Sequence, residues 1–305
     1  MAAAATPIPS RRDSLLGARL REAGWGYAFV LVPMAVFGLF FLYPFGYAIY
    51  ISFFHWGILG KQPGTGSIGF HNYHQVVDDP IFRIAIKNTL EYTVGVVPLT
   101  MALGLSIALI VNQKLRGKNF FRSAFFFPSI TSSVAITTII LYIFNSDGLF
   151  NRIIGSSTPW FQNAGTATWA IVGLNSWTSA GTAMLFYLAA LQAIPSDVYE
   201  AAAVDNTNAW RTFWRITFPL LRPAHFFVMV VFGIGALKIF DQPFIASGGS
   251  GGPNNSTQTG VLYIYREAFQ AFDFGVAAAA GVILFIIIFL LTLGQRLTVG
   301  RTQAS

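Results

Sequence analysis

Residues 200–223 read EAAAVDNTNAWRTFWRITFPLLRP, and this stretch indicates how the whole chain is organised. It is a polar, helix-forming segment in a sequence that is otherwise dominated by long apolar runs. Its charged residues cannot lie in lipid cheaply. They are Glu200, Asp205, Arg211, Arg215 and Arg222. Because alanines and aromatic residues alternate with these charges, the segment carries more apolar surface than a solvated connection needs, and we expect it to contact another protein.

The composition predicts an all-α polytopic membrane protein. The 305 residues are 54% hydrophobic and 10% charged, with a mean hydropathy of +0.58, whereas a soluble domain carries about 25% charged residues. A net charge of +7 favours nucleic-acid binding in a soluble protein, but here the basic residues follow a membrane topology, so we expect no nucleic-acid partner. The absence of cysteine excludes disulfides, thiol nucleophiles and cysteine metal sites.

Six apolar segments are long enough to cross a bilayer, which requires about 20 mostly apolar residues in a helix. They lie at about 27–54, 89–112, 123–145, 167–193, 223–246 and 275–297. The first follows many polar and basic residues and is too long for a signal peptide, so we expect it to remain as an anchor. The sequence therefore predicts a transmembrane domain over 27–298, after an N-terminal segment (1–26) and before a short tail (299–305).

The distribution of Lys and Arg predicts the orientation, because basic residues favour the cytoplasmic side. With the N-terminus inside, the cytoplasmic segments hold 13 Lys and Arg residues and the external segments hold five. Both termini and the loop over 195–222 are therefore expected in the cytoplasm. On the outside we expect a helix through 78–92, a Gly/Asn loop over 247–258 and an interfacial helix over 259–273.

The cytoplasmic loop is predicted to form two short helices joined by a turn, which we call the elbow (residues 195–222). Pro195 suits the start of a helix over 196–205. Asn accepts left-handed backbone geometry better than most residues, so Asn206 is the expected turn residue. A second helix is expected over 208–218, ending before Pro219.

The elbow resembles the EAA motif of ABC importer permeases, in which EAA is followed by Asp-Gly and then by Ile-x-Leu-Pro. The matching residues are Glu200, Ala201, Ala202, Asp205, Ile216 and Pro219. Asn206 and Phe218 stand where the family usually has Gly and Leu. Other segments, such as PMAVFGLFFLYPFGYAIYISFFHW (33–56) and VLYIYREAFQAFDFGVAAA (261–279), resemble the carbohydrate branch of maltose and glycerol-phosphate type.

The resemblance implies a type I ABC importer permease with six transmembrane helices and a cytoplasmic coupling helix. It implies a bacterial plasma (inner) membrane location and a second homologous permease, often as a heterodimer. Two ATPase subunits would hold ATP and Mg, and an extracytoplasmic solute-binding protein would deliver a sugar. The implied ATPase contacts are Glu200, Ala201, Ala202, Asp205, Asn206, Arg211, Arg215 and Pro219. For Arg211 and Arg215, simple positive-inside anchoring is an equal alternative.

Polar residues in the fourth span are the expected lining of a sugar path, because neutral polar groups and aromatic faces bind sugars. Asn175, Thr178, Ser179 and Thr182 return to nearly one helix face, and Trp177 lies among them. Hydrogen bonding between helices is an equal alternative for such residues. In the resembling family the spans that flank the EAA loop line the sugar site, which favours the pathway.

Two charged residues, Lys238 and Asp241, lie near the outer end of the fifth span. They are expected either to contact substrate or to pair with each other against the partner subunit. No catalytic residue or cofactor site is expected in this chain, since it has no P-loop. No metal site is expected either, because no further metal ligands accompany His71 and His74. The alternative function is a secondary transporter working alone, a class that usually shows inverted repeats.

Overall fold

The structure is a computed structural model that describes residues 11–61, 66–113 and 117–299. Residues 1–10 of the predicted N-terminal segment and 300–305 of the predicted tail lie outside the described residues. The chain divides into two units, Met1–Ile51 and Ser52–Ser305, which are described separately.

The first unit is one long helical segment with a wider turn near its end. Its parts are α1 (Arg11–Phe37), the π-helical η1 (Gly38–Leu42) and α2 (Tyr43–Ile51). Residues Glu22–Ile51 are long and apolar enough to cross a membrane, and none of their most apolar window is buried within the chain. This helix contains the predicted first span but ends at Ile51 instead of residue 54.

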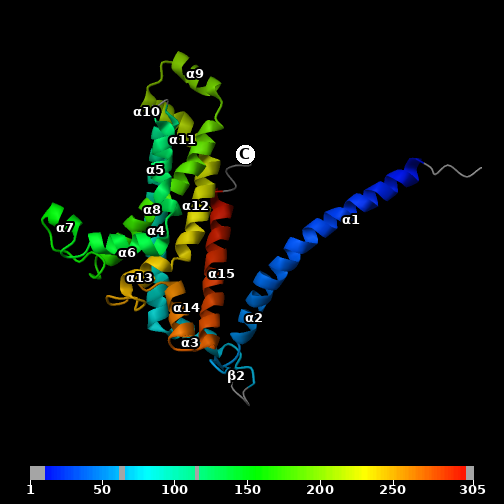
Figure 1. Ribbon diagram of the computed structural model, residues 1–305, viewed down its shortest axis with the longest axis vertical. Helices are drawn as coiled ribbons and strands as arrows, with labels where there is room; N and C mark the ends of the chain where they lie inside the picture. The colour runs from blue at the N-terminus through cyan, green and yellow to red at the C-terminus, as the bar shows by residue number, and fades with distance from the viewer. Residues whose placement is uncertain (1–10, 62–65, 114–116, 300–305) are drawn as a thin grey trace, which may run out of the picture. The chain divides into compact units, whose positions relative to one another are not determined.

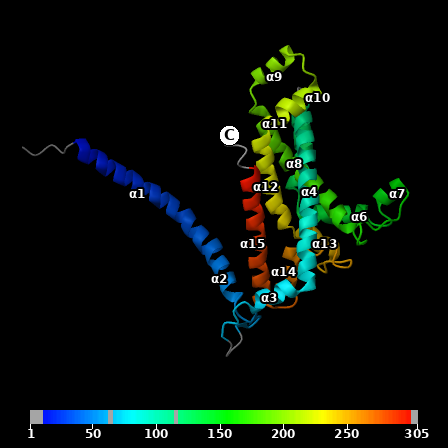
Figure 2. The same ribbon diagram turned by 180° about the vertical axis from the view of Figure 1, so that it is seen from behind.

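The second unit is built on four long helices that run side by side (Figures 1 and 2). These are α4 (Pro80–Asn112), α8 (Ala167–Gln192), α12 (Arg222–Leu237) and α15 (Phe274–Val299). The closest packing joins α4 to α8, where Gly104 faces Ala183. A Cβ atom at Gly104 would come within 2.5 Å of the Ala183 Cβ atom, so only glycine permits this approach. Small residues allow helices in membranes to pack in this way.

Short elements precede or connect these long helices. They are the hairpin strands β1 (Trp56–Gly57) and β2 (Gly60–Lys61), and the helices α3 (His71–Asp78), α7 (Leu149–Ile154) and α14 (Gly260–Phe269). The interfacial helix predicted over 259–273 ends at Phe269. Its continuation is broken before Phe272, whose φ of +57° is left-handed.

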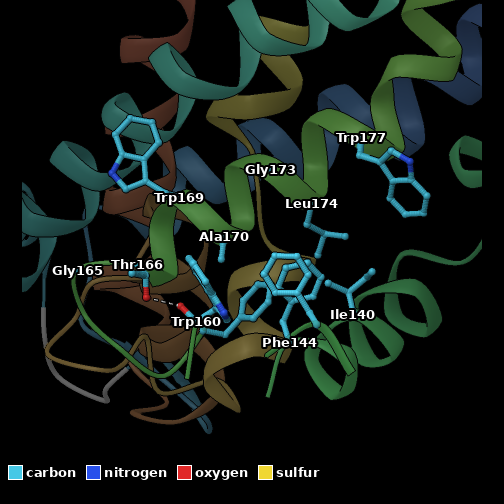
Figure 3. Close-up of a pocket in the computed structure, with 12 residues that line it drawn as sticks. Ile140, Phe144, Trp160, Gly165, Thr166, Trp169, Ala170, Gly173, Leu174 and Trp177 are labelled. Atoms are coloured by element: carbon cyan, nitrogen blue, oxygen red, sulfur yellow. Dashed lines mark hydrogen bonds between the residues drawn. The ribbon is translucent and has the colours of Figure 1, made fainter. Parts of the chain in front are cut away.

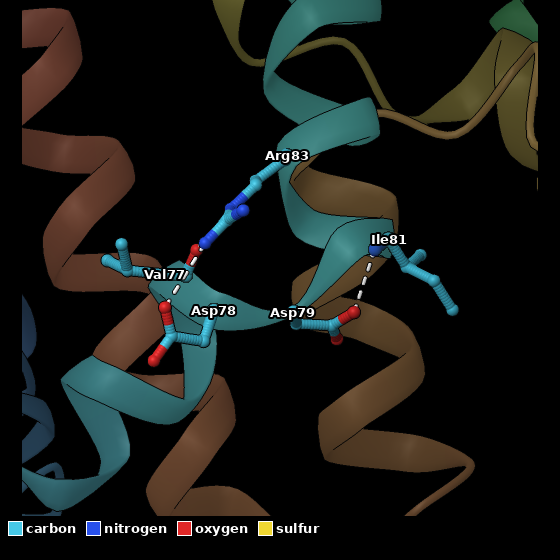
Figure 4. Close-up of polar contacts among 5 residues, drawn as sticks. All are labelled: Val77, Asp78, Asp79, Ile81 and Arg83. Atoms are coloured by element: carbon cyan, nitrogen blue, oxygen red, sulfur yellow. Dashed lines mark hydrogen bonds and ion pairs between the residues drawn. The ribbon is translucent and has the colours of Figure 1, made fainter.

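The helix α4 begins nine residues before the predicted second span because local capping signals start it early. The Asp79 Oδ1 atom accepts a hydrogen bond from the Ile81 backbone N–H at 2.7 Å, and Pro80 occupies the first turn. The Arg83 side chain then links the start of α4 to the end of α3. It forms an ion pair with the Asp78 carboxylate at 3.1 Å and donates a hydrogen bond to the Val77 carbonyl at 2.7 Å (Figure 4). The external helix predicted through 78–92 is therefore the first part of α4.

The segment predicted as the third span, at about 123–145, is not one straight helix. The segment forms two helices, α5 (Lys118–Ile130) and α6 (Ser133–Ile143), which meet at 95°. The break lies at Thr131 and Ser132, whose ψ angles of 147° and 125° are extended. Ser and Thr side chains compete with the helix for backbone hydrogen bonds, which weakens an apolar helix at this run of three.

The predicted fourth and sixth spans correspond to α8 and α15, and the predicted fifth corresponds to Arg222–Ser247, which qualifies as one membrane span although it consists of two helices. The helix α12 ends at Leu237, and α13 (Asp241–Ser247) follows after three residues. By length and composition, four helices of the described chain qualify as membrane spans, or five if α5 and α6 count as one. The helix α8 is long enough at 26 residues but falls outside this group, since it carries the polar residues discussed below.

Candidate functional site

The elbow projects from one end of the helical bundle, opposite α3 and α14 (Figure 1). Its elements are α9 (Ser196–Val204), α10 (Ala209–Thr212), the π-helical η2 (Phe213–Thr217) and α11 (Phe218–Leu220). The turn lies at Asn206, whose φ of +51° confirms the predicted left-handed residue. The Thr207 backbone N–H and Oγ1–H both donate to the Ala202 carbonyl, at 3.1 and 2.8 Å. The turn is therefore fixed from one side by a threonine.

The second helix of the elbow does not end before Pro219, as was predicted. It continues to Leu220 because η2 widens the turn just before the proline, with the Phe218 N–H bonded to the Phe213 carbonyl. Proline has no N–H, and in an α-helix its ring collides with the carbonyl four residues earlier. A π-helical turn shifts that carbonyl, so the chain remains helical through Pro219.

Six of the eight predicted contact residues lie on the exposed surface of the elbow, and two do not. Ala202 is only 5% exposed and packs inside the elbow, so it supports the turn instead of offering a contact surface. Pro219 is half-buried. The exposed members are Glu200, Ala201, Asp205, Asn206, Arg211 and Arg215. No ion pair within the described residues involves these charged side chains, since the two that occur there join other residues.

Large apolar side chains share the exposed surface of the elbow. Val204 is 82% exposed and Trp210 is 72% exposed, while Trp214 is half exposed. A water-facing loop gains nothing from such side chains, whereas clustered apolar and aromatic groups are typical of protein interfaces. The elbow thus combines uncompensated charge with unburied apolar area, which is the surface expected of a docking element.

The polar residues of α8 gather in one small cavity of about 160 Å³. Four of the predicted pathway residues line it: Asn175, Thr178, Ser179 and Thr182. Within the cavity wall, the Ser179 hydroxyl donates to the Asn175 Oδ1 atom at 3.1 Å, and the Thr178 hydroxyl donates to the Asn175 carbonyl at 3.0 Å. These bonds stay within α8, so helix-to-helix bonding does not account for these three side chains.

Other elements complete the cavity with residues that the sequence reasoning missed. They are Ser129, Thr131 and Ser133 at the α5–α6 bend, and Gln242 of α13. The Gln242 amide donates to the Ser133 hydroxyl at 3.2 Å, while the Ser129 hydroxyl is buried without a hydrogen-bond partner. The sequence does contain a signal for these cavity residues, which is a run of Ser and Thr inside an apolar stretch. The same run also predicts the break between α5 and α6.

A second small cavity, of about 190 Å³, shares Asn175 and Ser179 with the first. Its wall includes Tyr92 and Thr100 of α4, whose hydroxyls are buried and unpartnered. Buried polar groups without partners are rare in native proteins, so these hydroxyls are free to bind a polar group that enters the cavity. The two cavities therefore form a region rich in neutral hydrogen-bonding groups, and none of their lining residues is charged.

Three predicted pathway residues lie apart from this region. Trp177 lines a separate aromatic cavity of about 450 Å³ between α6, the following loop and α8, together with Trp160 and Trp169 (Figure 3). Lys238 and Asp241 are exposed at the break between α12 and α13. No ion pair joins these two described side chains, so the alternative of a mutual pair is not supported.

Residues 100–303 match the family described as the binding-protein-dependent transport system inner membrane component. The multiple sugar-binding transport system permease protein MsmF of Streptococcus mutans is 35% identical over 87% of this chain and 91% of its own length. The lactose transport system permease protein LacF of Rhizobium radiobacter is 33% identical over 88% and 92%. A bacterial ABC transporter that imports the acidic polysaccharide alginate has a similar fold, with a TM-score of 0.76 at 22% identity, covering 94% of this chain and 98% of that chain.

Proposed function

Because this chain belongs to the family of binding-protein-dependent transport inner membrane components, we propose that it forms the translocation pathway for a neutral sugar and receives mechanical energy through the elbow. It is a multi-pass membrane protein with the type I permease fold and a transport subunit of a sugar ABC importer. Because the chain belongs to this family, the alternative function of a stand-alone secondary transporter is excluded.

The observation that carries the coupling role is the surface of the elbow. It exposes Glu200, Arg211 and Arg215, which form no ion pair with another described residue, and Trp210, which is 72% exposed. Charged groups of this kind give register and specificity at an interface, and buried aromatic anchors give affinity. A cytoplasmic ATPase subunit that offers complementary charge and an apolar groove fits both requirements. With both termini in the cytoplasm, the elbow lies on the side where ATP is available.

The observation that supports sugar passage is the pair of neutral polar cavities on α8. Sugar hydroxyls need several neutral donors and acceptors, which Asn175, Ser179 and Gln242 offer together with the threonines. The absence of charge from the lining favours a neutral sugar over an acidic one. The multiple-sugar and lactose permeases named above transport sugars, as their names say.

The assembly we propose contains this permease, a second homologous permease, two ATPase subunits and an extracytoplasmic solute-binding protein. A heterodimer is proposed because relatives of this type are often encoded as different chains.

The experiment reverses the charge of Glu200 and measures ATPase binding and sugar uptake in membranes. Glu200→Lys is expected to reduce copurification of the ATPase at least tenfold and to abolish uptake, while the amount of permease in the membrane is unchanged. The matched control is Glu91→Lys, which makes the same change at an exposed residue on the external end of α4. ATPase binding by Glu200→Lys at the level of the control would refute the docking role.

A further inference from the structure

Five side chains form a continuous line of ring contacts from α10 in the elbow to the elbow-side end of α8 in the bundle. They are Trp210, Trp214, Phe218, His225 and Tyr187, in spatial order. Successive ring centroids are 5.6, 5.1, 4.4 and 5.3 Å apart. Aromatic pairs at these separations attract each other beyond their area burial, so each ring constrains the next.

The line runs from solvent to the protein interior. Trp210 is 72% exposed and Trp214 is 46% exposed, whereas Tyr187 is fully buried. Phe213 braces the middle of the line, since its ring contacts both Trp214 at 4.9 Å and Phe218 at 5.9 Å. A force on the exposed tryptophans therefore has a path of packed, rigid groups into the core.

His225 is the joint at which three elements meet. It lies in the first turn of α12, its ring packs on Phe218 of α11, and its Nδ1 atom is 3.0 Å from the Tyr187 hydroxyl of α8. Its Nε2 atom is buried and has no hydrogen-bond partner. Leaving a polar atom unpaired is unfavourable, so simple packing would be served better by phenylalanine.

A groove borders one side of this contact. Phe218, His225 and Tyr187 line this groove of about 680 Å³, which continues between α4, α12 and α15. On the side of the groove the hydrogen-bonded pair has fewer close-packed neighbours to displace than on the side of the core, where Tyr187 is fully buried. Tyr187 lies five residues after Thr182, so movement of Tyr187 moves the helix that carries the polar cavity.

We propose that the hydrogen bond between His225 and Tyr187 transmits displacement of the elbow to α8, which makes both side chains positioning residues for transport. This inference rests on the proposed coupling of the elbow to an ATPase. Without the bond, α8 would follow the elbow only through the backbone at each end of the loop and through apolar packing, and the cavity would respond less to nucleotide.

The experiment uses the absence of cysteine from the chain. Thr178→Cys places one thiol in the polar cavity of the complete transporter, reconstituted with its partner permease, ATPases and binding protein. The rate at which a membrane-impermeant maleimide labels this thiol is measured without nucleotide and after trapping with ATP and vanadate. The ratio of the two rates reports how strongly the cavity responds to the ATPase, independently of the amount of protein.

Tyr187→Phe removes only the hydroxyl, and His225→Phe keeps an aromatic ring beside Phe218. In each variant, the ratio of the two labelling rates is expected to lie about 3- to 10-fold closer to one than in the parent. This is the factor by which loss of one buried hydrogen bond weakens the coupling. The matched control is Phe227→Leu, which disrupts the ring contact between Phe186 of α8 and Phe227 of α12 at 5.0 Å, a contact outside the line. The control ratio is expected to equal that of the parent.

Three results would overturn the proposal, and they are distinguishable. If both variants keep the parent ratio while retaining the ATPase, the His225–Tyr187 bond has no role in transmission, although the coupling function stands. If Phe227→Leu lowers the ratio as much as Tyr187→Phe does, any loosening between α8 and α12 has this effect and the bond is not special. Failure of the parent itself to respond to ATP would contradict the coupling function as well.

Discussion

Replacing Asn206 tests whether a left-handed residue sets the geometry of the elbow. The Asn206 side chain is exposed and makes no side-chain hydrogen bond among the described residues, while its backbone N–H donates to the Ala203 carbonyl at 3.1 Å. A substitution therefore acts mainly through the φ of +51°. Holding a β-branched residue in this region costs about 1–2 kcal/mol, whereas glycine holds it without strain.

Local opening of the elbow should respond to this cost in proportion. A penalty of about 1–2 kcal/mol raises the open population of the elbow about 5- to 30-fold in Asn206→Val, and Asn206→Gly should open no more than the parent. Limited trypsin cleavage after Arg211 and Arg215 measures this population when opening and closing are fast. The control, Ala203→Val, adds valine at an exposed helical position and should change the rate only about twofold.

Equal cleavage rates for Asn206→Val and Asn206→Gly would refute this reasoning. The turn would then be held by contacts other than the backbone preference of residue 206. The result would also remove the argument that Asn replaces the usual glycine of the motif because it tolerates the same conformation.

Two further predictions concern packing and ionisation. A Cβ atom at Gly181 would collide with the Phe125 carbonyl of α5, so Gly181→Ala should destabilise the fold by about 1–3 kcal/mol. The control is Gly173→Ala, whose added Cβ atom meets no atom within 4 Å and which should keep or raise the thermal midpoint. Equal thermal midpoints for the two variants would contradict the clash. Burial, and then the carboxylates of Asp79 and Asp273, raise the pKa of Glu267. Its stabilising protonated form is lost as pH rises through that raised pKa. Glu267→Gln should therefore melt at or above the parent at pH 7, and a lower midpoint there would contradict the ionisation argument.

The sequence predicts the helical class and the elbow well because both depend on local signals. Long apolar runs need helices to satisfy their backbone in lipid, and the order of Pro195, Asn206 and Pro223 places the elbow between two spans. Its turn residue was correct for the same reason, since few residue types accept a positive φ. The early start of α4 also has a local signal, the capping pair Asp79 and Pro80. The apolar runs from which the spans are predicted do not include this pair.

The remaining features depend on contacts that no local pattern reports. The 95° break at Thr131 is stable because α6 packs against α13, an element more than 100 residues later. The burial of Ala202 follows from the turn closing over it, so the alanine run alone does not distinguish its exposed members from its buried one. Trp177 lies one residue from Thr178 but faces a different cavity, because neighbouring residues on a helix point about 100° apart.

The most direct test of the central claim is the sidedness of the elbow and its protection by the ATPase. Ala201→Cys, in a chain without other cysteines, is treated with a membrane-impermeant maleimide in intact spheroplasts and in inside-out vesicles. We predict labelling in the vesicles alone, and at least a tenfold slower rate when the purified ATPase subunit is bound. Labelling from the outer side, or a rate in vesicles that the ATPase leaves unchanged, would contradict the account.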